Sequence, residues 1–351
     1  MIWLTWRQYR AQAWTALAAL AAACAVYLPS GHRPADLYAA AGLPACAATA
    51  TGCAQAQAAF AASLRADSTV TALFHLGTAL LLVLPALLGM FAGVPLVARE
   101  LESGSFRLTW TQGVTRTRWL TVRLALVGAS TLLLSGLLSL LVTRWAAPLD
   151  RAAALPGGDG ESALPGRFGP PVFAAHGLAP VGWALFGLAV GVAAGLLLRR
   201  QVAAMAVVLA VLAAVQIAVP LLVRAHVAAP VRADRAVTLA PDRPGVIRIE
   251  GRRLYVSVPV SAPGAWVVSV RTLTADGRPF TGPAPDVCGP DVGSLAQCRE
   301  AIDALHLTQR AEYQPADRYW PFQWAETAAL ALLSAAVAAA CTVRLRRGVS
   351  A

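Results

Sequence analysis

The sequence of 351 residues contains no Lys and no Asn, and only 13% of its residues are charged. Without Lys there is no Schiff-base amine and no phosphate-binding lysine of the GxxxxGK[ST] type, so the chain cannot bind and hydrolyse ATP by that device. Without Asn there is no N-glycosylation acceptor. Soluble proteins carry about 25% charged residues. The charge deficit and a mean hydropathy of +0.59 therefore argue against a purely soluble fold.

Common enzyme motifs are also missing. The sequence has no HExxH, no GxSxG and no Gly-rich nucleotide fingerprint, and its five His residues show no metal-ligand spacing. We therefore expect no metal or cofactor in the chain, and an intramembrane enzyme is the least favoured function. The joint lack of Lys and Asn, beside abundant Ala, Arg, Gly and Pro, is typical of a GC-rich bacterial genome.

Long apolar runs are what the sequence does have. A helix that crosses a bilayer needs about 20 mostly apolar residues. Six runs predict an all-α polytopic membrane protein with spans at residues 11–28, 72–97, 124–143, 177–198, 202–223 and 321–343. The first run also fits a signal peptide, because Arg7 and Arg10 precede it and it ends near Pro29. Five further runs and no clear cleavage site favour an uncleaved helix.

The distribution of Arg predicts the orientation. If the N-terminus is cytoplasmic, the inner segments are residues 1–10, 98–123, 199–201 and 344–351. They hold 12 of the 29 Arg but only 2 of the 18 acidic residues, a net charge of +10, whereas the rest of the chain carries +1. Cytoplasmic loops carry the excess of basic residues. We therefore expect a protein of the bacterial plasma membrane with both termini on the cytoplasmic side. The total charge of +11 thus indicates a topology, and no nucleic-acid partner is expected.

The outer segments would then be residues 29–71, 144–176 and 224–320. The first is Ala-rich and is expected to be helical in its second half. Residues 156–171 form a Gly/Pro-rich linker. The last is long enough for a small extracytoplasmic domain. Valines at positions 256 to 260 and 267 to 270, separated by residues 261–264, predict strands and a turn, and a short helix is expected near residues 295–305.

Four of the six cysteines fall in the outer segments and none in an inner one. Disulfides persist on the oxidising side of a membrane. We predict two local disulfides, Cys46 with Cys53 and Cys288 with Cys298, although four cysteines allow three pairings. Cys24 and Cys341 lie within spans. The three alanines before Cys24 weakly resemble a lipoprotein cleavage site, but a buried thiol is the favoured interpretation.

The longest inner segment, residues 98–123, has an unusual order of side chains. Its acids come first, most of its Arg residues come later, and Trp110 and Trp119 interrupt the polar sequence. Such a loop can lie on the membrane face or dock against a partner. The alternative is that its positive charge only anchors the flanking helices, with Trp at the interface. Residues 1–10 are likewise expected to lie at the interface.

One stretch of this segment resembles a known family. Residues 93–105 read GVPLVARELESGS, and Leu108 and the TRTRW of residues 115–119 follow. This pattern is similar to the permease subunits of type-2 ABC exporters, in which a six-span subunit has an R-E-x-E-x-G-[ST] turn after its second helix and a polar stretch ending in [ST]-R before its third. Ser105 replaces the commoner Thr and keeps the hydroxyl.

The resemblance implies that residues 98–123 include a coupling helix that docks on a separate ABC ATPase subunit. Glu100, Glu102, Gly104 and Arg107 are the contact residues that it implies. ATP would then be bound by the partner, and the permease would act as a homodimer or with a similar subunit in the lipid bilayer. On this hypothesis the chain is a transport subunit and not an enzyme.

Glycines recur every four residues in two of the predicted spans. They are Gly187, Gly191 and Gly195 in the fourth span and Gly89 and Gly93 in the second. Faces of small residues let membrane helices approach closely. We expect packing or dimerisation surfaces, with packing inside one chain favoured. Pro85 predicts a kink near the middle of the second span, unless neighbouring helices simply tolerate it there.

Apart from Cys and Tyr, only His75 and Glu326 are ionisable within the runs. Glu326 follows an aromatic belt near the outer end of the last span, so we expect it either to pair with an outer Arg such as Arg318 or to act in transport. No acid or His lies at mid-membrane, where a secondary transporter binds its coupling ion. An ion-coupled transporter is therefore less favoured.

The leading hypothesis is the membrane subunit of an ATP-driven exporter. A membrane-anchored sensor or binding protein, acting through residues 224–320, stays open because that segment is large. The substrate is not specified by the sequence, since a path lined by Ala, Leu, Val and Gly would suit lipids, drugs or hydrophobic peptides alike.

Overall fold

The computed structural model describes residues 2–103, 116–156, 165–239, 245–260, 262–288 and 294–347. Within them, six helical segments are long and apolar enough to cross a membrane, as predicted. They are Tyr9–Ala40, Ser68–Arg99, Thr117–Ala153, Ala179–Leu198, Gln201–His226 and Ala316–Arg346. A small region of β-sheet precedes the last of these segments.

The helices of the first half are α1 (Ile2–Ser30), α2 (His32–Ala40), α3 (Leu43–Thr49), α4 (Cys53–Ala66), α5 (Ser68–Leu88), the π-helix η1 (Gly89–Gly93), α6 (Val94–Ser103) and α8 (Arg116–Ala153). Those of the second half are α9 (Pro170–Ala175), α10 (Ala179–Leu198), α11 (Gln201–Ala218), the π-helix η2 (Val219–Val223), the 3₁₀ turns η3 (Arg224–His226), η4 (Asp286–Cys288) and η5 (Ala316–Arg318), α12 (Leu295–Asp303) and α13 (Tyr319–Arg346).

Several helices extend beyond the predicted spans. α8 has 38 residues, against the 20 of the predicted third span, and it continues past Pro148 to Ala153. The loop at residues 29–71 is helical in its first half as well, where α2 and α3 form. Gly42 and Gly52 separate these short helices with φ of +77° and +67°, a left-handed conformation that glycine adopts without strain.

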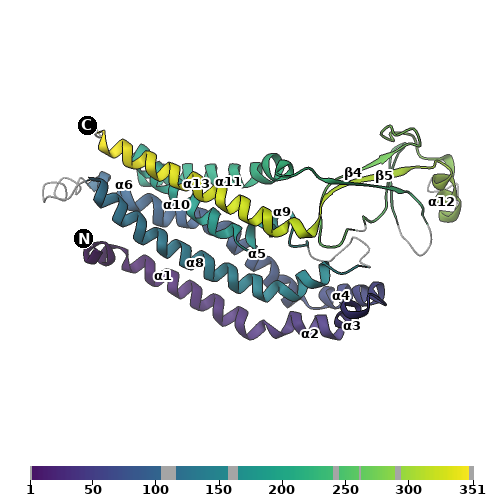
Figure 1. The fold of residues 1–351 in the computed structure, drawn as a ribbon, viewed down its shortest axis with the longest axis horizontal. Coiled ribbons are helices and arrows are strands. Elements are labelled where there is room, and N and C mark those ends of the chain that lie inside the picture. The colour runs from purple at the N-terminus through teal and green to yellow at the C-terminus, as the bar shows by residue number, and fades with distance from the viewer. Residues whose placement is uncertain are drawn as a thin grey trace.

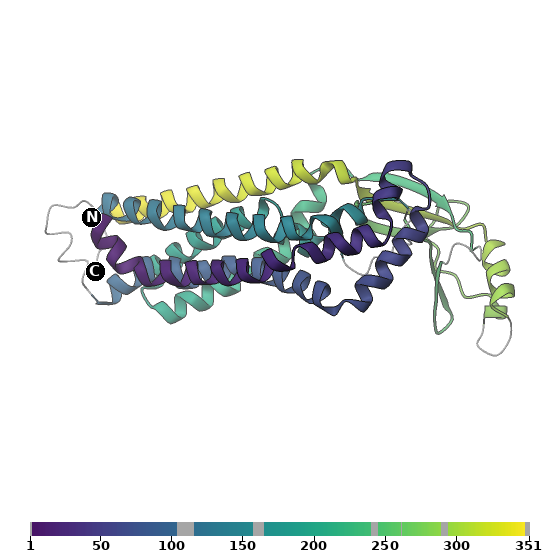
Figure 2. The same cartoon turned by 90° about the horizontal axis from the view of Figure 1, so that it is seen from below.

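The helices form an elongated bundle with the two termini at one end and the strands at the other (Figure 1). We call these the terminal end and the sheet end. α2, α3 and α4 lie at the sheet end, as the view turned by 90° also shows (Figure 2).

α10 is the central helix of the bundle. Of its most apolar window, 67% is buried, against 11% for α1 and for α11. It packs on α5, η1, α6, α8, α11 and α13. A helix that is apolar all round must be covered on all sides by protein or lipid. The surface of α10 is mostly covered by protein, whereas α1 and α11 direct apolar side chains outward.

The second span is irregular around Pro85. Pro85 has no N–H to donate to the carbonyl of Leu81, and the π-helix η1 begins four residues later. Glutamines from two neighbouring helices bond to carbonyls of this stretch. Gln216 Nε2 lies 2.9 Å from Leu82 O and Gln12 Nε2 lies 2.7 Å from Phe91 O. Such side-chain bonds satisfy backbone groups near a helix break.

The strands form two antiparallel sheets. β1 (Val231–Ala236), β5 (Thr308–Gln314) and β4 (Trp266–Leu273) give a three-stranded sheet in the order β1-β5-β4. β2 (Val246–Glu250) and β3 (Arg253–Ser257) form a separate hairpin.

The two valine groups that predicted neighbouring strands therefore lie in different sheets. Polar side chains join the sheets, since Gln309 on β5 donates to Val258 O at 2.6 Å and accepts from Val258 N at 2.7 Å. A small core with α12, which includes Leu254, Val256 and Ile302, closes this region. The predicted helix near residues 295–305 is α12, and Ser294 begins it with a capping box to Gln297.

Candidate functional site

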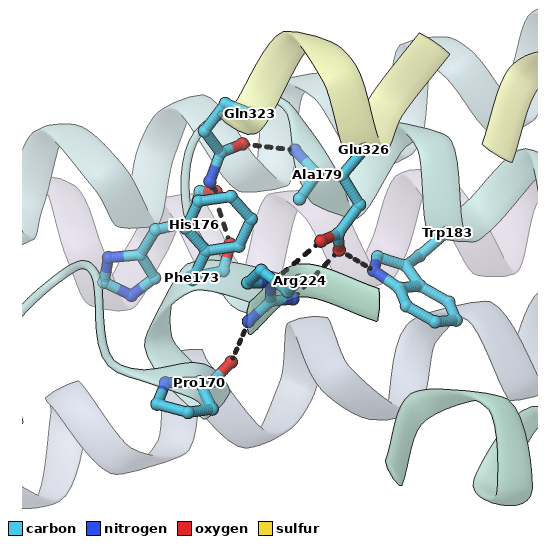
Figure 3. Close-up of polar contacts among 8 residues, drawn as sticks. All are labelled: Pro170, Phe173, His176, Ala179, Trp183, Arg224, Gln323 and Glu326. Carbon is cyan, nitrogen blue, oxygen red and sulfur yellow. Dashed lines mark hydrogen bonds and ion pairs between the residues drawn. The ribbon is translucent and has the colours of Figure 1, made fainter. Parts of the chain in front are cut away.

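A buried ion pair joins three helical segments near the sheet end of the bundle. Arg224 Nε lies 2.9 Å from Glu326 Oε2, and Arg224 Nη2 lies 3.0 Å from Glu326 Oε1, a bidentate geometry (Figure 3). The side chain of Arg224 is 1% exposed and that of Glu326 is 10% exposed. Trp183 Nε1 also donates to Glu326 Oε1, at 3.0 Å. The pair thus links η3, α13 and α10.

Two further contacts complete the surroundings of Arg224. Its Nη1 donates to Pro170 O at 3.1 Å, and its Cζ lies 4.2 Å from the centroid of the Phe173 ring (Figure 3). Both partners belong to the short helix α9. A buried charge is tolerated only when it is paired and hydrogen-bonded. Glu326 on α13 therefore neutralises the charge of Arg224, and α9 supplies a hydrogen-bond acceptor and an aromatic face to its guanidinium group.

Gln323, one turn before Glu326, binds the connection between α9 and α10. Its Oε1 accepts from the backbone N–H groups of Leu178 and Ala179 at 2.9 and 2.7 Å. Its Nε2 donates to the carbonyls of Phe173 and His176 at 2.9 and 3.0 Å (Figure 3). These are backbone groups that helix ends leave without partners. A side chain of α13 therefore fixes the end of α9 and the beginning of α10.

His176 lies in this connection and is fully buried. Among the described residues neither ring nitrogen has a hydrogen-bond partner, and the ring packs against Phe74 with centroids 5.7 Å apart. Burial lowers the pKa of His176 to about 4, because the charged form would lose its hydration. His176 is therefore neutral at pH 7 and contributes to packing.

The cluster differs from the sequence prediction in its partners. Glu326 pairs with Arg224 and not with Arg318, which instead donates to Ala229 O at 2.7 Å and to Gln314 Oε1 at 2.8 Å. Arg224 was expected at the start of the outer domain, but the π-helix η2 extends the fifth span so that η3 still packs in the bundle. One signal in the sequence was available: Arg224 is the first charge after the fifth run, and Glu326 is the only acid in the sixth.

The glycines of the two spans lie opposite one another. A Cβ placed on Gly187 would lie 2.2 Å from Pro85 O, and one placed on Gly191 would lie 2.2 Å from Gly89 O. The other glycines are equally close to backbone: Gly89 to Gly187 O at 2.6 Å, Gly93 to Leu188 O at 2.7 Å and Gly195 to Val94 O at 2.8 Å, each measured from the same hypothetical Cβ. We call this contact between α10 and the α5–η1–α6 segment the glycine seam.

At the terminal end, Glu102 on α6 is the one residue of the implied coupling set whose side chain the structure describes. Its Oε1 accepts from the backbone N–H of Gln201 at 2.8 Å, where α11 begins. A carboxylate there accepts a hydrogen bond from an otherwise unpaired N–H group, and its negative charge interacts favourably with the positive end of the helix dipole. The side chain of Glu100, with Gly104 and Arg107, lies outside the described residues.

The predicted disulfides are confirmed: Cys46 is bonded to Cys53 between α3 and α4, and Cys288 to Cys298 between η4 and α12. Both lie at the sheet end. Cys24 and Cys341 are free thiols in α1 and α13. In the described part of the chain no group of three potential metal ligands comes together.

The polar contacts described above join separate helical segments to one another. The buried charges at the sheet end are neutralised by one another, and the polar side chains around them tie helix ends together. α10 contributes to both the cluster and the seam, since its Trp183 donates to Glu326 and its glycines form one side of the glycine seam.

Comparison with known protein families gives a match over the first part of the chain. A family model described as ABC-2 membrane transporter related matches residues 17–224, which is more than half of the chain and ends at Arg224. No curated protein and no solved structure shows significant similarity to the chain.

Proposed function

This chain belongs to the ABC-2 membrane transporter related family, and we propose that it is the membrane subunit of an ABC exporter, driven by a separate ATPase subunit that docks on residues 98–123. The ATPase binds and hydrolyses ATP, and this chain supplies the path through the membrane. The terminal end faces the cytoplasm, in keeping with the excess of Arg in the segments that reach it.

The observation that carries the proposal is the attachment of α6 to the centre of the bundle. Residues 98–103 of α6 form the first part of the proposed docking segment. Its Glu102 bonds to the first residue of α11, and Arg123 at the start of α8 donates from Nη1 to Leu96 O on α6 at 3.2 Å. The glycine seam adds backbone contact with α10. A force applied to residues 98–123 would therefore act on four helices together.

The same helices reach the buried cluster at the sheet end. α10 begins at the backbone groups that Gln323 binds, and its Trp183 donates to Glu326. α11 leads through η2 to Arg224. Movement imposed at the terminal end would thus be felt at the point where α9, α10 and α13 meet. We propose that this cluster keeps the sheet end of the path closed until the ATPase subunit acts.

The outward apolar faces of α1 and α11 fit the assembly that the proposal needs. The exposed side chains include Trp14 and Leu17 on α1 and Leu209 and Ile217 on α11. Lipid or a second permease, identical or similar, would cover them. A homodimer and a heterodimer both meet this requirement.

A sensor acting through the sheet region is the second candidate. It is favoured by the separate core of that region, which Leu254, Val256 and Ile302 help to build. Deletion of the sheet region distinguishes the two functions. An exporter subunit lacking it would still bind the ATPase, whereas a sensor would lose its only ligand-binding part.

Copurification of the ATPase tests the proposal directly. The partner is sought as a neighbouring reading frame that carries GxxxxGK[ST]. The variant Glu100→Ala/Glu102→Gln removes two negative charges but keeps an oxygen at position 102 that can accept from Gln201 N. We expect at least a tenfold loss of bound ATPase, with an unchanged gel-filtration profile.

The matched control is Glu250→Ala/Glu300→Ala, which removes two exposed acids at the sheet end. It should retain full attachment. Attachment that persists in the variant at positions 100 and 102 would count against the docking assignment, and so would an equal loss in the control.

A further inference from the structure

A groove opens between α10 and α13 at the terminal end of the bundle. Its volume is about 760 Å³, which lies within the range of small-molecule sites. The walls come from these two helices and are apolar, with Leu196 and Leu197 on one side and Val337 and Val343 on the other. Neither the glycine seam nor the Arg224 cluster contributes to it.

Among the residues that the structure describes, three arginines line this groove and no acid does. Arg199 directly follows α10, Arg344 lies in the last turn of α13, and Arg347 directly follows α13. All three are exposed, and within the described residues none of them forms a salt bridge. The groove therefore combines apolar walls with three positive charges where two apolar helices end.

The backbone of Arg199 adds a second observation. Its φ is +55°, a left-handed conformation that glycine or asparagine usually adopts at the end of a helix. Residues other than glycine in sparsely populated backbone conformations cluster at functional sites. Here Arg199 adds a guanidinium group to the lining of the groove.

We propose that this groove binds an anionic phospholipid. The arginines lie where the two candidate spans end, which is the level of the lipid headgroups. Their guanidinium groups would bind the phosphate, and the acyl chains would lie along the apolar walls. Basic pockets between membrane helices select anionic headgroups in this way. The inference requires only that the chain is a membrane subunit and is independent of the ATPase contact.

Other occupants match the groove less well. Free phosphate would use the arginines but would leave the apolar walls uncovered. A zwitterionic lipid carries a cation that would be repelled by three guanidinium groups. The proposed ATPase contact lies on residues 98–123, and none of the residues in this segment that the structure describes, 98–103 and 116–123, lines the groove.

Native mass spectrometry of the delipidated full chain tests the proposal. We expect phosphatidylglycerol to bind at least tenfold more tightly than phosphatidylcholine. The variant Arg199→Gln/Arg344→Gln should weaken phosphatidylglycerol binding about tenfold or more, since each basic side chain near an anionic surface contributes on the order of fivefold in affinity.

A closely matched control is Arg200→Gln/Arg346→Gln. It removes two exposed arginines from the same helix ends, and neither residue lines the groove. Its phosphatidylglycerol affinity should change less than twofold. Equal weakening in both double variants would overturn the proposal, because it would indicate attraction by net charge alone.

Two further results would overturn the proposal. One is complete displacement of phosphatidylglycerol by millimolar inorganic phosphate, which would mean that the apolar walls bind nothing. The other is a groove variant that keeps its phosphatidylglycerol affinity but loses the copurified ATPase, which would make the groove a protein contact. Retained ATPase together with weakened lipid binding supports the lipid site and leaves the proposed function intact.

Discussion

Arg224 and Glu326 are the most costly charges to separate in the described part of the chain. We expect Arg224→Leu to destabilise the fold by about 3–5 kcal/mol, because it leaves the Glu326 carboxylate buried without its counter-charge. The double variant Arg224→Leu/Glu326→Leu should lose much less than the sum of the two single variants. Unfolding in detergent, arranged as a double-mutant cycle, measures this coupling.

The control for this cycle is an exposed pair. Arg248 and Glu250 are 3.7 Å apart, and their side chains are 70% and 59% exposed. Arg248→Leu should change stability by no more than about 0.5 kcal/mol. An Arg224→Leu variant as stable as Arg248→Leu would contradict the assignment of a buried pair.

His176 should make stability depend on pH. Its pKa is about 4 in the fold, against 6.5 for the free side chain, so the unfolded chain binds the extra proton between these values. The stabilisation is therefore complete above pH 6.5 and is lost as pH falls toward 4, to the extent of about 3 kcal/mol.

The variant His176→Leu isolates this effect, since neither ring nitrogen has a described partner to lose. We expect its unfolding temperature to fall less than that of the wild type between pH 6.5 and 5. The control is His226→Leu, which replaces a histidine whose side chain is exposed, and its unfolding temperature is compared over the same pH range. A His176→Leu variant with the full sensitivity would show that other groups cause it.

At the residue scale, sequence reasoning succeeded where partners are near in the chain. The two disulfides join cysteines 7 and 10 residues apart, so a local pairing was the simplest choice. Arg224 and Glu326 are 102 residues apart, and only the packing of η3 against α13 brings them together. No local pattern encodes that contact, which is why Arg318, only eight residues from Glu326, was the expected partner.

At the scale of elements, the glycine seam leads to a prediction about Gly→Ala substitutions, which should change stability in opposite directions at two positions. Gly191→Ala should destabilise the fold by about 1–3 kcal/mol, because its Cβ would lie 2.2 Å from Gly89 O and backbone cannot move aside cheaply. Gly128→Ala on α8 meets nothing within 4 Å. It should stabilise the fold by roughly 0.5–1 kcal/mol through helix propensity.

Unfolding in detergent again provides the measurement. Similar small effects of the two substitutions would mean that α10 and the second span are further apart than the structure places them. The comparison is well matched, since both glycines lie inside long apolar helices and both receive only a methyl group.

The elements show where prediction from sequence ends. Six apolar runs were enough to locate the spans, because the bilayer sets the length of a helix that crosses it. The sheet was harder. β1 pairs with β5 across more than 70 residues, whereas the spacing of valines favoured a local turn between β3 and β4. Strand order depends on contacts with α12 and with side chains such as Gln309, which periodicity does not reveal.

At the scale of the whole molecule, cysteine labelling can test which end of the bundle faces the cytoplasm. We expect Cys288, which is only partly buried, to be labelled by an impermeant maleimide in intact spheroplasts after its disulfide is reduced. A cysteine introduced as Arg346→Cys should be labelled only after permeabilisation. The opposite result would reverse the proposed orientation, and with it the side on which the ATPase docks.

The glycine seam has one further geometrical consequence. α5 and α10 run in the same direction, because Pro85 meets Gly187 and Gly89 meets Gly191. The repeat of four residues corresponds to about 6 Å along a helix axis. A slide of that length would bring Gly191 to Pro85 and Gly195 to Gly89, so the same kind of backbone contact would form again. Intermediate positions would press side chains onto backbone. The spacing of the glycines is therefore compatible with two registers of these helices, and both place glycine against backbone.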